Sequence, residues 1–497
     1  MATVGQNTIG RTGKESAARP GVEVKHVVRK LALGGIIGII FFSVSGGPYG
    51  LEDTIGEAGP GMGLLLILIT PIIWSLPTAL MVAELATAIP VEGGYYYWGK
   101  TALGPFWGFS LTWWVWIAGI VDLALYPVLF VAYASYFFPV LQESALAGWL
   151  VAVALVWVFA YVNIRGSTLV GDSSKLFLVI VLLPFVLVTI IGLFKMQYNA
   201  FQPFTFEGVG VPTAFGAGLF VVMWNYMGWD GLSTVMGEID NPRRDYPRAL
   251  AITLPVITLI YFIPTFVCLS VVGATNVEWT AGAYNVVAAK VGGPWLGTLM
   301  TITAMISAIG LYSAWLLQYS RIPFALARDG FFPPRLTRLH PRFGTPTLAI
   351  IIQASICSVL VLSAFGSLVA IDVTIYACAL VLEFASLIVL RIKRPNMVRP
   401  FKVPGGWVGV GLMTLFPVFV IVLAVYFQVL DVGAVQGIGW AAIGLATGPA
   451  MYYLLRRRKR RRGVDYVFDF ESCELRNAWA EEPRAPREPQ ATEEGSP

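Results

Sequence analysis

Long runs of apolar residues, separated by short polar segments, fill most of this 497-residue chain. A helix of about 20 apolar residues is long enough to cross the ~30 Å hydrocarbon core of a bilayer. Twelve runs of roughly this length or more cover residues 31–56, 63–88, 105–138, 147–165, 170–193, 213–238, 249–273, 294–322, 346–364, 367–391, 407–430 and 434–455. The pattern predicts an all-α integral membrane protein with twelve transmembrane helices and no soluble domain.

Two glycine-rich segments interrupt these runs. The first, SGGPYG, covers residues 45–50, and the second, WNYMGWDG, covers residues 224–231. A backbone in hydrocarbon cannot leave N–H and C=O groups unpaired, so a broken helix must line a cavity enclosed by protein or filled with water. Paired broken helices in corresponding positions of two halves indicate the binding site of a transporter. We therefore expect discontinuous helices in the first and sixth runs, with the site between them.

The chemistry of broken helix ends leaves two kinds of substrate open. Helices that end near Ser45 and Trp224 direct unpaired carbonyls and negative dipole ends at the cavity, which suits an ammonium group. The half-helices that begin near Gly50 and Gly231 present N–H groups, which suit a carboxylate. An amino acid and an amine therefore both fit. Pro48, which removes one N–H from the first break, favours the amine.

Basic residues are distributed unevenly among the loops. With the N-terminus in the cytoplasm, all but three of the 34 lysines and arginines fall on the cytoplasmic side. The exceptions are Lys175, inside a run, and Lys195 and Lys290, on the outside. Because cytoplasmic loops carry the excess of basic residues, both termini are predicted to be cytoplasmic. The net charge of +5 reflects this orientation, and we expect a lipid bilayer but no nucleic acid as a partner.

Composition argues against an enzyme. The chain is 57% hydrophobic and 13% charged, and its four cysteines and two histidines show no spacing typical of a metal site or a disulfide framework. We therefore predict no metal and no cofactor. Residues 94–101, GYYYWGKT, match the phosphate-loop pattern literally, but aromatic side chains fill positions where small residues let amides cradle phosphate. Without an ATP motif, secondary transport follows by elimination.

Several short motifs resemble those of the amino acid–polyamine–organocation superfamily of transporters. They are STVMGEIDNP (233–242), PRA (247–249), AEL (83–85), GTP (344–346) and RPFKVP (399–404). Three others resemble the polyamine uptake permeases within that superfamily: VSGGPYGLED (44–53), DLALYPVLF (122–130) and LEF (382–384). The resemblance covers roughly residues 30–455.

This resemblance implies a fold of two inverted five-helix repeats around a site near the middle of the membrane. The repeats would cover residues 31–193 and 194–392, with two further helices in 393–455. Residues 1–30 and 456–497 would be a cytoplasmic N-terminal segment and a basic, then disordered, cytoplasmic tail. The resemblance also implies alternating access, in which a core bundle rocks against a scaffold.

Ionisable side chains inside the runs are candidate functional groups, because they are costly in a membrane. The acids are Glu52, Asp53, Glu57, Glu84, Asp122, Asp230 and Glu383. Asp230 lies in the second break and is expected to bind a cation or a proton, or to cap the following half-helix. Asp122 and Glu383 are candidates for a second ammonium partner, although an internal hydrogen bond would also explain Glu383. Glu52, Asp53 and Glu57 are expected to face the outer vestibule.

The remaining candidate substrate-binding residues lie in the breaks or come from the resemblance. They are Ser45, Gly46, Gly47 and Asn225 in the breaks, Trp224 at the position of an aromatic lid, and Tyr126 and Tyr376 in the cavity wall. An indole face over a cation contributes about 0.5–2 kcal/mol.

Glu84 and Glu238 are assigned to gating or coupling, Glu84 through a contact with the first helix or first loop. Lys175 is a candidate coupling residue. Some bacterial relatives carry a lysine in the fifth helix where sodium-coupled relatives bind sodium, but the matching position here is Val181. Lys175 lies nearly two helical turns earlier, so proton coupling through a carboxylate is preferred.

These observations predict a proton-coupled importer of a polyamine such as putrescine or spermidine in the cell membrane. An amino acid permease on the same fold, proton-coupled or exchanging, is the alternative. A nutrient sensor that binds without transporting is a more distant one.

Overall fold

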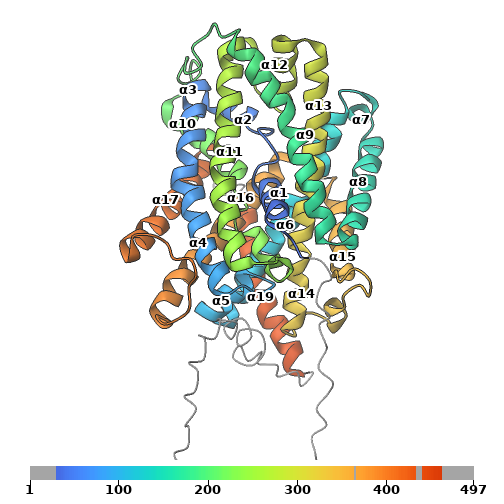
Figure 1. The fold of residues 1–497 in the computed structure, drawn as a ribbon, viewed down its shortest axis with the longest axis vertical. Helices are drawn as coiled ribbons and strands as arrows, with labels where there is room; N and C mark the ends of the chain where they lie inside the picture. The colour runs from blue at the N-terminus through green and yellow to red at the C-terminus, as the bar shows by residue number, and fades with distance from the viewer. Residues whose placement is uncertain (1–29, 363–364, 433–438, 462–497) are drawn as a thin grey trace, which may run out of the picture.

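The computed structural model describes residues 30–362, 365–432 and 439–461, and these form a bundle of helices (Figure 1). In chain order the main helices are α1 (Leu33–Val44), α2 (Glu52–Ala58), α3 (Pro60–Thr70), α4 (Leu76–Ala88), α5 (Tyr95–Leu103), α6 (Pro105–Ala134), α7 (Val140–Glu143), α8 (Ala145–Arg165), α9 (Ser167–Leu193), α10 (Val211–Asn225), α11 (Pro242–Val272), α12 (Ala283–Gly292), α13 (Pro294–Tyr319), α14 (Arg321–Arg328), α15 (Thr347–Leu360), α16 (Phe365–Lys393), α17 (Gly406–Val432) and α19 (Gly439–Arg461). The prediction of an all-α fold is confirmed for the described residues.

Within the described residues, eight helices are long and apolar enough to cross a membrane. Three shorter apolar helices are α1, α10 and α15. Residues 363–364, at the end of the ninth predicted run, and residues 433–438, at the start of the twelfth, lie outside the described residues. The count of twelve transmembrane helices therefore stays a prediction.

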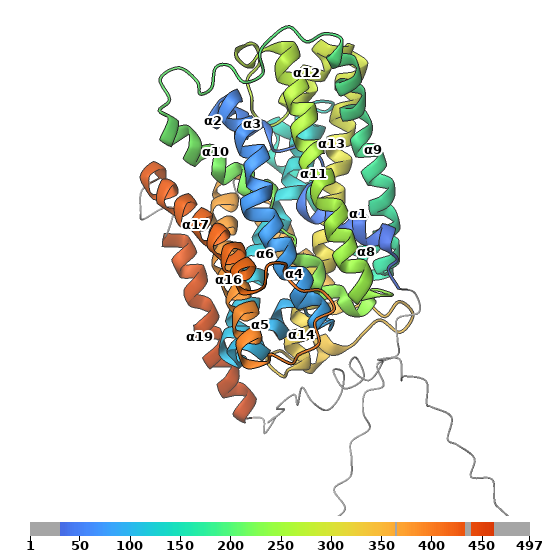
Figure 2. The same cartoon turned by 60° about the vertical axis from the view of Figure 1, so that its left-hand side comes forward.

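Helices at the centre of the bundle are more buried than those at its edge. In the α13–α14 segment 67% of the most apolar stretch lies inside the molecule, against 22% for α8. Figure 1 shows α1 near the middle of the bundle, and Figure 2 shows α17 and α19 together along one side. Large apolar side chains such as Leu150 of α8 and Val179 of α9 face outwards. This arrangement gives the bundle a lipid-facing exterior and leaves polar groups for the centre.

The first glycine-rich segment breaks its helix as predicted. Helix α1 ends at Val44, and α2 begins at Glu52. Between them Gly46, Gly47 and Gly50 have φ angles of 63°, 101° and 92°. Residues with a Cβ rarely adopt these angles, so glycine permits the chain to turn here without backbone strain.

The second break has a different continuation from the one expected. Helix α10 ends at Asn225, and Gly228 has a φ of 95°. An eight-residue 3₁₀ segment, η2 (Gly231–Glu238), then replaces the predicted second half-helix, and Val235 leaves helical geometry within it. A 3₁₀ helix is more tightly wound than an α-helix and has poorer hydrogen-bond geometry, so it usually occurs in short segments.

The two breaks contact each other in the middle of the bundle. The Asn225 side-chain amide donates to the Gly50 carbonyl at 3.2 Å. A Cβ atom on Gly228 would lie 2.4 Å from the Ser43 carbonyl oxygen, so only glycine fits this crossing. The close approach brings the ends of α1 and α10 to one place.

Candidate functional site

A small cavity lies beside the two breaks. Its wall comes from α1, α6, α10, α13 and α16 together with the breaks, and its volume is about 40 Å³. A water molecule needs roughly 10–15 Å³ measured in this way, so the cavity has room for a few waters. The predicted residues that line it are Ser45, Asp122, Tyr126, Trp224, Asn225 and Tyr376.

Two carboxylates face this cavity. Asp122 of α6 is 4% exposed, and both its oxygens accept from the Tyr126 hydroxyl, at 2.9 and 2.8 Å. Asp372 of α16 is 3% exposed and close enough to Asp122 for the two charges to repel. Among the described residues that line the cavity there is no lysine, arginine or histidine. Among its described residues the wall therefore presents two acidic side chains and no basic one.

Sequence reasoning missed Asp372, although it lies inside the predicted run 367–391. The rule that selected the other acids, an ionisable group within an apolar run, applies to it equally. The motifs that resemble polyamine permeases did not include it. Its position opposite Asp122 becomes visible only when α16 is placed against α6.

Helix α1 directs its carbonyl end at the same cavity. The backbone N–H groups of Ser45 and Gly46 both donate to the Phe41 carbonyl, at 2.8 and 3.1 Å. This doubled contact leaves the following carbonyls of the last turn, including those of Ser43 and Val44, for other partners. Ser43 and Val44 line the cavity. The negative end of the helix dipole thus adds to the charge of the two aspartates.

The amides of the first break are used by the protein itself. The Gly47 N–H donates to the Ser45 hydroxyl at 3.0 Å, and the Gly50 N–H donates to Oε2 of Glu52 at 2.6 Å. Glu52 is fully buried, so the expectation that it faces an outer vestibule is wrong. Its side chain turns back from the first residue of α2 to the break, where it accepts from the Gly50 N–H, an amide with no partner within a helix.

Gly46 and Gly47 were expected to contact a substrate, but neither is among the described residues that line the cavity. The Gly46 carbonyl accepts from the Ser307 hydroxyl of α13. Gly47 abuts α9, where an added Cβ would lie 2.9 Å from a Val181 methyl group. These glycines shape the break and allow close packing.

Asp230 lies behind the cavity wall. It is 1% exposed and accepts from the Tyr376 hydroxyl, which separates it from the cavity. A direct contact between Asp230 and a cavity cation is therefore not what the structure provides. The alternative role as a helix cap is not seen either, because its side chain makes no cap hydrogen bond. Glu383 is likewise buried next to Asp230 and outside the described cavity wall.

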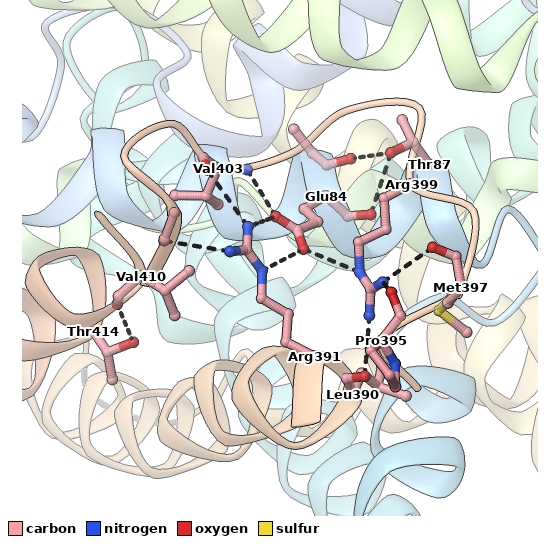
Figure 3. Close-up of polar contacts among 12 residues, drawn as sticks. Glu84, Thr87, Leu390, Arg391, Pro395, Met397, Arg399, Val403, Val410 and Thr414 are labelled. Atoms are coloured by element: carbon pink, nitrogen blue, oxygen red, sulfur yellow. Dashed lines mark hydrogen bonds and ion pairs between the residues drawn. The ribbon is translucent and has the colours of Figure 1, made fainter. Parts of the chain in front are cut away.

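Glu84 forms the centre of an ion-pair network at one end of the bundle. Figure 3 shows its carboxylate between two guanidinium groups: Arg391 contacts it at 2.8 and 2.5 Å, and Arg399 at 3.3 Å. The Val403 N–H also donates to it, at 2.7 Å. The expected contact with the first helix or first loop is thus wrong, because the partners of Glu84 come from α16 and the loop after it.

Arg399, in that loop, remains a cation despite its surroundings. Burial lowers the pKa of Arg399 from its ordinary value, and the nearby Arg391 acts in the same direction while Glu84 opposes them. An arginine stays protonated under such conditions. The network therefore retains two positive charges around one carboxylate.

Glu238 and Lys175 have very different surroundings. Glu238, at the end of η2, forms a buried ion pair with Arg321 at 2.9 Å. Lys175 is 47% exposed and pairs with Asp172 at 2.6 Å on its own helix. The pairing places Lys175 on an outer face of α9, away from the described residues of the cavity.

The chain belongs to the amino acid permease family, whose model matches residues 30–455. It is a membrane transporter and not an enzyme. It is 33% identical to the rice polyamine transporter PUT1 over 93% of this chain and 86% of that protein. It is 32% identical to the Arabidopsis thaliana polyamine transporter RMV1, over 89% of each chain. The branched-chain amino acid permease BcaP of Bacillus subtilis is 26% identical over 86% of this chain and 91% of that protein.

Proposed function

We propose that this protein imports a polyamine such as putrescine or spermidine across the cell membrane by proton-coupled alternating access. One observation carries the choice of substrate. Asp122 and Asp372 face one cavity, and no basic side chain lies among the described residues of its wall. Buried charges need partners, and a cationic substrate supplies one.

The cavity offers two negative poles to a molecule with two ammonium groups. The aspartates form one pole, and the last carbonyls of α1 form the other. Trp224 adds an aromatic face, half-buried in the wall beside Asp122. A zwitterion would instead need an amide-rich end for its carboxylate, and the Gly47 and Gly50 amides already have acceptors within the protein.

Transport requires the wall to move, because about 40 Å³ is too small for a diamine. Ion pairs close one end of the bundle: Glu84 with Arg391, Glu238 with Arg321, and Lys100 with Asp329 at 2.8 Å. We place this end in the cytoplasm, together with both chain termini, because the basic loops lie there. Opening towards the cytoplasm would separate these pairs.

The same proposal includes the internal symmetry. Helices α1 and α10 head the two proposed repeats, residues 31–193 and 194–392, and each ends at a glycine-containing break. Residues 393–455 would add two helices outside the repeats. A site between two broken helices is typical of transporters built in this way.

Counterflow in proteoliposomes tests the substrate class. Vesicles loaded with unlabelled putrescine should take up labelled putrescine, and spermidine should compete better than zwitterionic amino acids. Stronger competition by an amino acid than by either amine would overturn the polyamine assignment in favour of an amino acid permease.

A further inference from the structure

A second pair of buried acids, Asp230 and Glu383, lies behind the cavity. Each is 1% exposed. Oδ2 of Asp230 and Oε2 of Glu383 are buried and have no hydrogen-bond partner among the described residues. The two carboxyl groups are near enough for their charges to interact. They come from different elements, Asp230 from the second break and Glu383 from α16.

The groups around this pair are hydroxyls and not cations. Tyr95 of α5, Tyr246 of α11 and Tyr376 of α16 all lie within electrostatic reach of both acids. Within the described chain neither acid forms an ion pair with a lysine, arginine or histidine. Two like charges buried together without a cation repel strongly, and a single proton held between them removes that repulsion.

Tyr376 connects this pair with the cavity wall and with the second break. Its hydroxyl donates to Asp230, accepts from the Gly228 N–H at 3.4 Å, and lines the cavity. A hydrogen bond to an ionised carboxylate is about twice as strong as one to a neutral group. Protonation of the pair therefore loosens Tyr376 at the junction of the cavity wall and the second break.

We propose that Asp230 and Glu383 together hold the proton that is coupled to transport, and that Tyr376 passes their protonation state to the cavity. The inference rests on the proposed proton-coupled uptake of an amine. It assigns substrate and proton to separate acid pairs. Asp122 and Asp372 face the cavity, where an ammonium group neutralises them, whereas the Tyr376 side chain keeps the substrate away from Asp230.

The test uses full-length protein in proteoliposomes with the membrane potential clamped at zero. An inward gradient of one pH unit should let the wild type accumulate labelled putrescine about tenfold for each coupled proton. In Glu383→Gln and Asp230→Asn the pair can no longer exchange a proton as a unit. These variants should only equilibrate putrescine, an accumulation of about onefold, while still exchanging labelled for unlabelled putrescine in counterflow.

Three controls keep the outcomes separate. Glu57→Gln, at an exposed acid of α2, should accumulate putrescine like the wild type. Glu383→Asp, which restores an acid, should recover accumulation. A pH-sensitive dye inside the vesicles should report acidification of the vesicle interior when putrescine is added to the wild type, but not when it is added to Glu383→Gln. If one neutral variant fails to fold, the other carries the test, because each removes one member of the same pair.

The results distinguish the two proposals. Tenfold accumulation by folded Asp230→Asn and Glu383→Gln would overturn the proton site and leave polyamine uptake intact. A wild type that shows no counterflow of any amine would overturn the proposed function. A wild type that exchanges putrescine but ignores the pH gradient would overturn proton coupling and the proton site together.

Discussion

Replacing Asp372 by asparagine tests the charge of the cavity most directly. The change keeps the size of the side chain and removes one of two carboxylates that face each other in a site only 3–4% exposed. A charge-assisted hydrogen bond lost from a desolvated site costs about 1.5–3 kcal/mol. This loss corresponds to an affinity for putrescine about 10- to 150-fold weaker.

The same substitution should stabilise the protein without substrate. Asp372 and Asp122 repel each other at a pH at which both are ionised, so the loss of one charge then removes an unfavourable interaction. We therefore expect the unfolding temperature of Asp372→Asn to rise while its affinity for putrescine falls. Few mechanisms other than a substrate-neutralised acid pair predict these opposite signs.

Labelled-putrescine binding to purified protein measures the affinity, and thermal unfolding with and without putrescine measures the stability. Tyr126→Phe is the matched control, because it removes the donor to Asp122 and keeps both charges. Putrescine affinity within twofold of wild type in folded Asp372→Asn would refute the assignment of this residue to the substrate. A fall in both affinity and unfolding temperature would show that Asp372 stabilises the fold instead.

Three other substitutions follow from single contacts. Gly228→Ala should abolish putrescine counterflow but leave membrane insertion normal. The new Cβ would meet the Ser43 carbonyl oxygen at 2.4 Å, and the φ of 95° disfavours alanine. Counterflow by Gly228→Ala at the wild-type level would contradict the close crossing of the breaks. Trp224→Leu should weaken putrescine binding by about 0.5–2 kcal/mol, with Trp224→Phe retaining most of it, and equal losses in both would exclude a role for the ring. Arg391→Gln should lower the free energy of unfolding, but by less than the ~3–5 kcal/mol that a fully broken buried ion pair costs. The loss is smaller because Arg399 still contacts Glu84. An unchanged free energy of unfolding in denaturant would show that this network does not stabilise the fold.

Local signals in the sequence located the breaks well. Glycines at positions that need positive φ, and a run of apolar residues on either side, predicted where α1 and α10 end. Asp122 was also found, because one long helix carries it in an apolar run. These features depend on a few neighbouring residues, which the sequence displays directly.

Contacts between distant segments were beyond such reasoning. Position in a break suggested that Asp230 meets the substrate, but Tyr376, 146 residues later, lies between Asp230 and the cavity. Glu84 finds its partner Arg391 at a separation of 307 residues. Lys175 was a candidate coupling residue because it lies in an apolar run, yet its side chain is 47% exposed on α9. The sequence gives the position of each of these residues within its apolar run. It does not show which distant segment packs against the side chain.

The contact between Glu52 and Gly50 has a consequence for selectivity among nutrients. The carboxylate of Glu52 is tethered two residues from the amide that it binds. A group on a short tether has an effective local concentration of about millimolar or more. The carboxylate of a free amino acid would have to displace the Glu52 carboxylate before it could bind the Gly50 N–H. Under the proposed function, Glu52 thus competes with the carboxylate of a zwitterion for this amide, and an amine, which has no carboxylate, is unaffected by it.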